Sequence, residues 1–426
     1  MQLDDQEKRM LEGKEGEATR RAMEILVAKG EAEGANKMVK IVYAHLMPPD
    51  TMFFPFGRQG QWARELTGEL TSGITRLRVP ATMEPKFVDL ECCARRMEFS
   101  ENQIDEMRNI MLPAADFYEK LGVIPSYTAM PFVIFPTKLG EHVSIAESIA
   151  ILWYNTMFGS RCERDDGVTS LAAAITGVYP EIGVHLTQNR YGEVLIRPGK
   201  DVDPLTLNYT DWDAYSLAAS RKCKEKTPVF VGLPVNLTFT QKKHLLEVIA
   251  VESGLAIMHI VAVTPEAPTV EAALGGRKPI AEFEINQGDL EEAYHIATTA
   301  RDPRVNYVFL GCPHVTLPEF RELANVLDGK KVHPDVTLIV STSWQFLMMA
   351  RDMGYVDIIE KAGGIVAQDM CIAFSGTQAS GTIATDSIKA AFFYTGFSSK
   401  TTRRVWLGNI RECAKAAITG KWNERR

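Results

Sequence analysis

The hydrophobic positions in the second half of the chain form continuous runs, separated by segments of helical period. The runs are rich in β-branched side chains and cover residues 255–263, 305–311, 336–341 and 364–370. Intervening segments such as TLPEFRELANVL repeat their apolar residues every three or four positions. Strands buried on both faces of a parallel sheet give continuous apolar runs. The pattern therefore predicts a doubly wound, mostly parallel α/β sheet.

The first half of the chain alternates helical and strand-like segments. Residues 1–40 are predicted to be helical, with Asp4 and Asp5 available as caps. The segments VYAHLMP and RLRVPATM are predicted as short strands that run into loops. Residues 141–177 again have a helical pattern, and Gly177 is placed to end that helix. The approximate subdomains predicted are residues 1–135, a central helical and α/β region at 136–245, and the doubly wound region at 246–426.

A narrow polar stripe crosses the apolar segment 140–159. At 3.6 residues per turn, one helical face collects Glu141, Ser144, Glu147, Ser148 and Asn155. Apolar side chains cover the remainder, which inverts the usual amphipathic pattern. Because unpaired carboxylates are costly in an apolar core, the stripe predicts a buried helix that lines a polar cavity. The alternative is a surface helix with a narrow exposed face.

Chemically active side chains follow the four apolar runs. In open parallel sheets, the loops after the carboxyl ends of the strands converge on one crevice, where ligands bind. These loops supply Glu266, Cys312, His314, Ser341, Thr342, Ser343, Asp369 and Cys371. Each has a structural alternative: the cysteines as small buried hydrophobes, Glu266 as a helix cap, and the serines as an N-cap cluster instead of an anion site.

Basic side chains near these segments predict binding of an anion. Those downstream of the polar stripe are Arg161, Arg164, His185 and Arg190, with Asn189 among them. The planar fork of arginine can bind two oxygens of a carboxylate or phosphate. The glycine-rich segment 375–389 ends at Lys389, and it is either a backbone nest for an anion or a plain flexible loop.

Composition narrows the classes of partner. The 426 residues are 46% hydrophobic and 24% charged, with a net charge of −7, and no basic cluster is interleaved with aromatics. The sequence therefore predicts neither nucleic-acid binding nor attraction to anionic membranes. No apolar run approaches the roughly 20 residues of a membrane span. The acidic start MQLDDQEKRM does not resemble a signal peptide, and seven scattered cysteines do not form a disulfide framework, so we predict a cytoplasmic protein.

Short segments spread over nearly the whole chain resemble one known family. They are GEHVSIAES, AAAITG, GVHLTQNR, VAVTPEAPT with its extension EAALGG, GCPH, STS and TDSIK. Together they resemble the large subunit, or catalytic domain, of the aconitase X family. The resemblance implies an aconitase-like three-layer α/β/α catalytic body with mostly parallel sheets, lacking the swivelling small domain. It also implies a hydro-lyase that removes water from a small hydroxy acid, such as cis-3-hydroxy-L-proline or mevalonate 5-phosphate.

The resemblance further implies an iron-sulfur cluster, held by three cysteines, whose open iron position polarises the substrate hydroxyl. Cys312 and Cys371 match two of these positions, but the third falls on Ala129, in SYTAMPF, where the family has T-Y-T-C-x-P-Y. One alternative is a mononuclear divalent metal at Cys312 and Cys371 with His314 or Glu266. A second alternative is that Cys162 replaces the missing third ligand. A third is that Arg, Lys and His groups alone stabilise an enolate-like intermediate, without a metal. Glu163 also departs from the family, which has Asn there, and this change is expected to affect substrate preference.

The mechanism predicted from the resemblance is an elimination of water. Proton transfer and catalysis are assigned to Glu141, His142, Glu147 and Lys389. Substrate contacts are assigned to Ser144, Asn155, Arg161, Arg164, His185, Asn189, Arg190, Glu266, Ser341, Ser343 and Ser387. A separate swivelling-domain subunit of about 130 residues is expected to complete the site. The alternatives are a cofactor-independent isomerase or lyase, and a degenerate paralogue that acts as an anion-binding or regulatory module.

Overall fold

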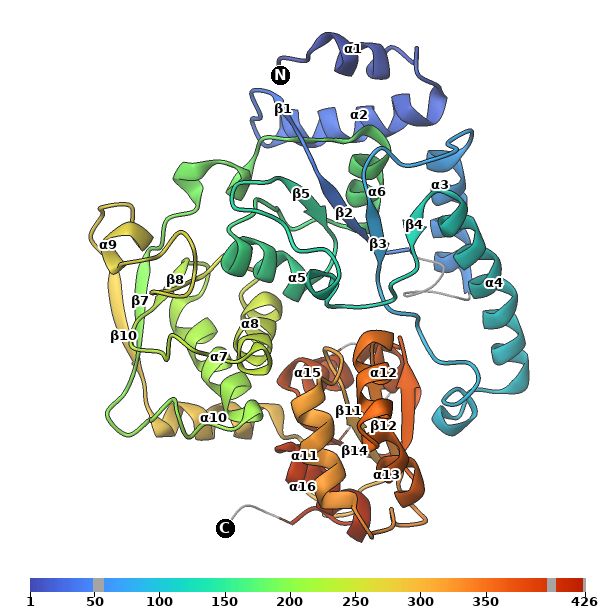
Figure 1. The fold of residues 1–426 in the computed structure, drawn as a ribbon, viewed down its shortest axis with the longest axis vertical. Helices are drawn as coiled ribbons and strands as arrows, with labels where there is room; N and C mark the ends of the chain where they lie inside the picture. The colour runs from blue at the N-terminus through green and yellow to red at the C-terminus, as the bar shows by residue number, and fades with distance from the viewer. Residues whose placement is uncertain (49–56, 397–403, 424–426) are drawn as a thin grey trace.

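The structure is a computed structural model that describes residues 1–48, 57–396 and 404–423. Three parallel sheets follow one another along the chain, with helices packed around them (Figure 1). The first is drawn in blue to teal, the second in green to yellow and the third in orange to red. This mixed α/β architecture confirms the predicted fold class. Within the described ranges, no helix is both long enough and apolar enough to cross a bilayer.

The first sheet has four parallel strands in the order β4-β3-β2-β5. They are β2 (Tyr43–Leu46), β3 (Ala81–Met83), β4 (Val123–Ile124) and β5 (Val143–Ile145). The helices of this region are α1 (Asp5–Leu11), α2 (Glu17–Ala32), α3 (Gly57–Thr71), α4 (Glu101–Lys120) and α6 (Gly167–Thr176). The strands predicted in VYAHLMP and RLRVPATM are confirmed as β2 and β3, which pair with each other.

The N-terminal helix starts at a capping box. Asp4 Oδ1 accepts a hydrogen bond from the Glu7 amide, and Glu7 Oε2 accepts one from the Asp4 amide, each at 2.8 Å. The predicted cap at Asp4 is therefore confirmed. The helical prediction for residues 1–40 was too long at its end, because β1 (Met38–Lys40) pairs antiparallel with β6 (Val178–Pro180).

The second and third sheets are also parallel. The second has the order β10-β7-β8-β9, formed by β7 (Val194–Pro198), β8 (Pro228–Phe230), β9 (His259–Ile260) and β10 (Ala281–Ile285). The third has the order β13-β12-β11-β14-β15, formed by β11 (Tyr307–Leu310), β12 (Thr337–Thr342), β13 (Ile365–Gln368), β14 (Thr382–Thr385) and β15 (Arg404–Leu407). The helices of these two regions are α7 (Tyr209–Cys223), α8 (Phe239–Glu252), α9 (Val270–Ala273), α10 (Gln287–Ala297), α11 (Leu317–Leu327), α12 (Trp344–Asp352), α13 (Tyr355–Ala362), α14 (Ile372–Ser375), α15 (Ile388–Gly396) and α16 (Ile410–Thr419).

One of the four apolar runs was placed in the wrong sheet. Three of them form β11, β12 and β13 of a single sheet, as predicted. The run at 255–263 instead contributes β9, which pairs with β8 of the second sheet. Apolar periodicity records that a strand is buried but not which strand it pairs with. The subdomain boundaries near residues 135 and 245 stay predictions.

The segment 141–177 is only partly helical, so the predicted polar stripe was wrong as a helical face. Residues 143–145 form β5, which pairs with β2 in the first sheet. Glu147 has an extended backbone, with φ of −110° and ψ of 129°, and accepts a hydrogen bond from the Ile149 amide as the N-cap of α5 (Ser148–Trp153). Strand pairing thus overrides the local helical pattern before residue 147. Gly177 ends α6 in a left-handed conformation, as predicted.

Candidate active site

A cavity of about 210 Å³ lies where strand ends of the first and third sheets meet. Its wall includes residues directly after β2, β3 and β5 on one side and after β11 and β13 on the other. The polar groups and thiols that line it are Glu84, Glu147, Ser148, Arg164, Asp165, Cys312, His314, Cys371 and Lys389. Parallel sheets present their strand ends to ligands in this way, so two sheets contribute to one site.

A buried ion pair lies in the wall of this cavity. Lys389, at the start of α15, places its Nζ 2.9 Å from Glu147 Oε1 and 3.1 Å from Ser148 Oγ. Burial opposes both charges, but the ammonium outweighs it and lowers the pKa of Glu147, while the carboxylate raises the pKa of Lys389. Both groups are therefore ionised, and Lys389 brings a fixed positive charge to the cavity.

A second carboxyl group, Glu84, was missed by the sequence analysis. It follows β3, is fully buried, and places Oε1 2.9 Å from Nε2 of His45. Burial raises the pKa of Glu84 well above its usual range and lowers that of His45 to about 3, so both are neutral. Glu84 could have been selected from the sequence, because it directly follows the strand predicted in RLRVPATM. Residues after the strands of a parallel sheet often bind ligands.

Asp165 is a third carboxyl group that the sequence analysis did not select. Its two oxygens accept hydrogen bonds from Tyr179 at 2.5 Å and Ser144 at 2.6 Å. Burial raises the pKa of Asp165 to about 7, despite these two donors. A carboxyl group with a pKa near neutrality can exchange a proton at physiological pH.

Six of the predicted site residues line this cavity. They are Glu147, Arg164, Cys312, His314, Cys371 and Lys389. The other predicted residues lie outside its lining, namely Glu141, His142, Ser144, Asn155, Arg161, His185, Asn189, Arg190, Glu266, Ser341, Ser343 and Ser387. The catalytic and substrate-binding roles assigned to them stay predictions.

Arg190 and its neighbours form a separate structural cluster. The Arg190 guanidinium donates to Glu266 from Nε and Nη2. Its Nη1 donates to Asn155 Oδ1 and to the Val184 carbonyl, and its Nη2 also donates to the Ser160 carbonyl. This buried arginine therefore has its donors engaged within the protein. His142 and His185 pair through their Nδ1 atoms at 2.8 Å nearby.

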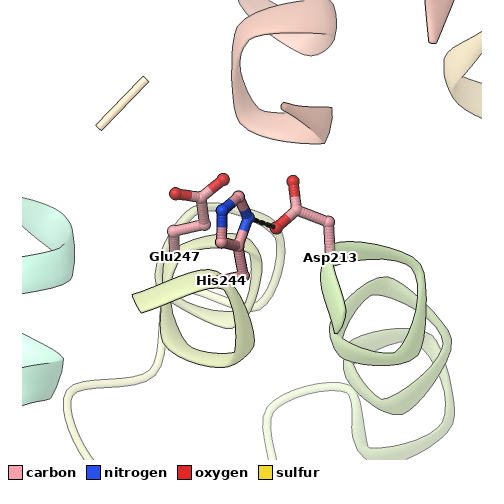
Figure 2. A group of neighbouring side chains, drawn as sticks. All are labelled: Asp213, His244 and Glu247. Atoms are coloured by element: carbon pink, nitrogen blue, oxygen red, sulfur yellow. Dashed lines mark hydrogen bonds and ion pairs between the residues drawn. The ribbon is translucent and has the colours of Figure 1, made fainter. Parts of the chain in front are cut away.

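A buried ionic network joins the second and third regions. His244 Nδ1 lies 2.7 Å from Asp213 Oδ1, and His244 Nε2 lies 2.9 Å from Glu319 Oε1 (Figure 2 draws Asp213, His244 and Glu247). Lys243 Nζ lies 2.7 and 2.8 Å from the two Glu319 oxygens. Among the described residues, Asp213, His244 and Glu247 are the group whose potential ligand atoms lie within 4.8 Å of one another. Because both ring nitrogens of His244 are already engaged, this geometry is that of an ion-pair network rather than a metal site.

The stability of the protein is expected to fall as pH rises from about 6.5 to 10. Burial opposes protonation of His244, but Asp213 and Glu319 outweigh it and raise its pKa from 6.5 to about 10. Between these two values the folded protein keeps a proton on His244 that the unfolded chain has lost. The stability that His244 contributes is therefore complete below pH 6.5 and is lost as the pH rises through 10. The slope of unfolding free energy should approach about −1.4 kcal/mol per pH unit. Urea titrations at several pH values measure it, and a H244Q variant should flatten it.

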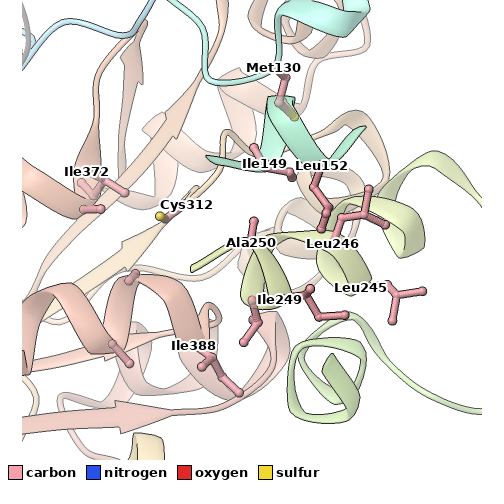
Figure 3. Close-up of a cluster of buried hydrophobic side chains, with 14 of the residues drawn as sticks. Met130, Ile149, Leu152, Leu245, Leu246, Ile249, Ala250, Cys312, Ile372 and Ile388 are labelled. Atoms are coloured by element: carbon pink, nitrogen blue, oxygen red, sulfur yellow. The ribbon is translucent and has the colours of Figure 1, made fainter. Parts of the chain in front are cut away.

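The cysteine set does not fit the three-cysteine cluster implied by the family. Cys312 lies at the edge of the buried apolar cluster that includes Ile149, Ile249 and Ile388 (Figure 3), and Cys371 lines the same cavity. Ala129 also lines this cavity but offers only a methyl group. The alternative of a mononuclear metal is not supported either, because among the described residues His314 and these two cysteines do not have their ligand atoms within 4.8 Å of one another. Cys162, the predicted replacement ligand, lies outside the lining of the cavity.

Restoring the missing thiol is expected to create cluster binding. After anaerobic reconstitution with iron and sulfide, Ala129→Cys should hold more iron and sulfide per chain than the unmodified protein, with the visible absorption of a cluster. Ala146→Cys is the matched control, because Ala146 lines the same cavity but does not match a family cysteine position. Equal iron and sulfide in the unmodified protein and in Ala129→Cys would contradict the expectation.

These features define an α/β enzyme whose acid, base and cationic groups meet at strand ends. Profiles of the aconitase X first, second and third domains match residues 1–188, 192–295 and 305–419. The chain belongs to the aconitase X family.

Named relatives cover most of the chain. The phosphomevalonate dehydratase large subunit of Methanothermobacter thermautotrophicus is 32% identical over 92% of this chain and 94% of its own. The cis-3-hydroxy-L-proline dehydratase of Pseudomonas aeruginosa is 27% identical over 98% of this chain and 70% of its own. The crystal structure of aconitase X from Thermococcus kodakaraensis in its holo-form superposes with a TM-score of 0.83, at 25% identity, over 98% of this chain and all of that one. The chain is thus an enzyme of the hydro-lyase type.

Proposed function

We propose that this protein removes water from a small hydroxy acid, with cis-3-hydroxy-L-proline and mevalonate 5-phosphate as the first candidates. The relatives named above are dehydratases of these two kinds of compound. The observation that carries the proposal is the combination of two cations, Lys389 and Arg164, with two carboxyl groups of raised pKa, Glu84 and Asp165, in one cavity. An elimination of water needs this combination, because the substrate is an anion and two protons must move.

The charges of the cavity favour an anionic substrate. Lys389 is paired with Glu147, and Arg164 uses Nη1 to bond the Ala250 carbonyl at 2.7 Å, which leaves further guanidinium donors at the exposed mouth. A carboxylate or phosphate can bind two guanidinium donors at once. The volume of about 210 Å³ suits a compound smaller than the drug-sized ligands of typical pockets. Small hydroxy acids meet both conditions.

Asp165 is the group that we assign to accept the proton from carbon. Its pKa of about 7 makes the carboxylate and the acid similarly populated at neutral pH. Tyr179 and Ser144 hold both of its oxygens, so the carboxylate cannot rotate freely. Orientation of this kind lowers the entropic cost of the proton transfer.

A small second subunit completes the site in this proposal. The relatives from M. thermautotrophicus and Methanocaldococcus jannaschii are named as large subunits. This chain covers 94% and 100% of those two proteins, but only 70% of the P. aeruginosa enzyme. A swivelling domain supplied by such a subunit would close the mouth of the cavity against water.

The test is a turnover assay with the chain co-expressed with such a small subunit. Each candidate acid is incubated anaerobically, and loss of one water is followed by mass spectrometry. Turnover of either compound supports the proposal. Rearrangement without loss of water would instead indicate an isomerase, and saturable binding of both compounds without any reaction would indicate an anion-binding module.

A further inference from the structure

We propose that Glu84, oriented by His45, donates the proton that converts the substrate's leaving hydroxyl into water. The inference rests on the proposed function and names a catalytic residue for it. Hydroxide is a poor leaving group, so an elimination enzyme must protonate it or bind it to a Lewis acid. Because Ala129 leaves the cysteine set one thiol short, the task falls to an acid within the protein.

Glu84 is placed where a donor is needed. It directly follows β3, its amide donates to the Leu46 carbonyl at 2.9 Å, and its side chain is fully buried in the wall of the cavity. Oε1 is held by His45, whereas Oε2 is buried without a hydrogen-bond partner in the described structure. A buried polar atom without a partner costs stability, so its presence calls for an explanation such as a catalytic role. Of the described residues with such atoms, Glu84 is the one that also lines this cavity.

His45 connects Glu84 to a chain of buried hydroxyl groups. His45 Nδ1 lies 2.7 Å from Thr82 Oγ1, which in turn contacts the hydroxyl of Tyr43. If Tyr43 donates to Thr82 and Thr82 to His45, the Nε2–H of His45 donates to Glu84 Oε1. The acidic proton then resides on Oε2, the oxygen of this cavity-lining residue that has no partner in the described structure. This direction satisfies every donor along the chain, and it makes the free oxygen of Glu84 an O–H donor.

The protonation states of the neighbouring groups agree with this direction. Glu147 and Lys389 are the charged groups that act on the pKa of Glu84, and His45 contacts its Oε1. Burial raises the pKa of Cys371, and a charge on Glu84 raises it further. Burial keeps Glu84 protonated and His45 neutral, whereas Glu147 is an anion beside Lys389. The carboxyl groups of the cavity therefore differ in protonation state: Glu84 is a neutral acid, Glu147 is fixed in an ion pair, and Asp165 titrates near neutral pH. Different protonation states allow different roles.

The elimination balances with these groups. Asp165 takes the proton of the substrate C–H bond, and the electron pair of that bond becomes the carbon–carbon double bond. The C–O bond breaks with its electrons on oxygen, which accepts the Oε2 proton of Glu84 and leaves as water. Glu84 is then a carboxylate that keeps the hydrogen bond from His45. Proton exchange from Asp165 through solvent restores the starting state, and nothing is oxidised or reduced.

The first experiment compares Glu84→Gln with the unmodified protein, using whichever acid is turned over. Gln keeps the size and the bond to His45 but cannot transfer a proton, so kcat should fall about 10²- to 10⁴-fold with little change in KM. Glu91→Gln is the matched control, since Glu91 is exposed and on the loop that follows the same strand. Full activity of Glu84→Gln would overturn the inference while leaving the proposed function standing.

His45 is tested as a positioning residue. His45→Gln can still donate to Glu84 and should recover most of the kcat lost in His45→Ala, because only orientation is required of it. Equal losses in the two variants would overturn this role.

A spectroscopic readout decides the inference if no candidate acid is turned over. The infrared difference spectrum between the unmodified protein and Glu84→Gln should contain the C=O band of a neutral, buried carboxylic acid. A carboxylate band in its place would show that Glu84 has no proton to give and would overturn the inference. If the neutral-acid band is present, the missing turnover counts against the proposed function alone.

Discussion

Replacing Lys389 with Met is expected to lower the free energy of unfolding by about 3–5 kcal/mol and to abolish turnover. Lys389 Nζ lies 2.9 Å from Glu147 Oε1, and both side chains are 8% exposed. Without the ammonium, Glu147 is a buried charge without an ion-pair partner, so it must either bear the cost of desolvation or take up a proton. Under the proposed function, the cavity also loses one of the two cations that favour an anionic substrate. Urea denaturation and the turnover assay measure the two effects.

Two further variants separate the charge effect from a packing effect. The double variant Lys389→Met with Glu147→Leu removes both charges, so it should recover much of the lost stability while remaining inactive. Lys415→Met replaces an exposed lysine of α16 and should change stability by less than about 0.5 kcal/mol. If Lys389→Met unfolded at the same urea concentration as the unmodified protein, the buried ion pair would not have the role described.

Replacing Glu319 with Gln is expected to cost about 3–5 kcal/mol of stability by breaking the buried ionic network. Burial opposes ionisation of Glu319, but Lys243 and His244 outweigh it and lower its pKa to about 2. The carboxylate also accepts hydrogen bonds from the amide of Thr316, at 2.7 Å, and from its hydroxyl. Gln cannot balance the charges of Lys243 and His244. Both cations would then be buried, with His244 still hydrogen-bonded to Asp213.

The matched control is Glu322→Gln on the same helix. Glu322 pairs with Arg411, whose side chain is 61% exposed, so its loss should cost only about 0–1 kcal/mol. Glu319→Gln should also lower the pKa of His244 and thereby weaken the pH dependence of stability between 6.5 and 10. A Glu319→Gln variant as stable as Glu322→Gln would show that the network contributes little to holding the second and third regions together.

The local pattern of the chain was sufficient for much of the site. Cys312 and Cys371 were found because they follow continuous apolar runs, and β11 and β13 do end beside one cavity. Lys389 and Glu147 were found in segments that resemble the aconitase X family, and they form one ion pair although 242 residues separate them. The fold class, the capping box at Asp4 and the helix end at Gly177 also follow from residue type and order.

Other features depended on tertiary pairing. The sequence did not reveal that residues 143–145 form a strand, because the helical pattern is local whereas the pairing with β2 is not. It placed Arg190 at the substrate, but folding directs its donors to Glu266 and to buried oxygens of the protein. In the same way it omitted Glu84, whose chemistry comes from His45 on the neighbouring strand.

By itself, the sequence determined the family, through short segments that resemble it, and the α/β class, because burial and periodicity are encoded along the chain. It also placed Cys312, His314 and Cys371 after strands of the third sheet. Only the tertiary structure decided which carboxyl groups are neutral, which are paired and which face the cavity. Those properties depend on partners within about 3 Å and on exclusion from water. Both are set by residues that are distant in the sequence, so no local pattern contains them.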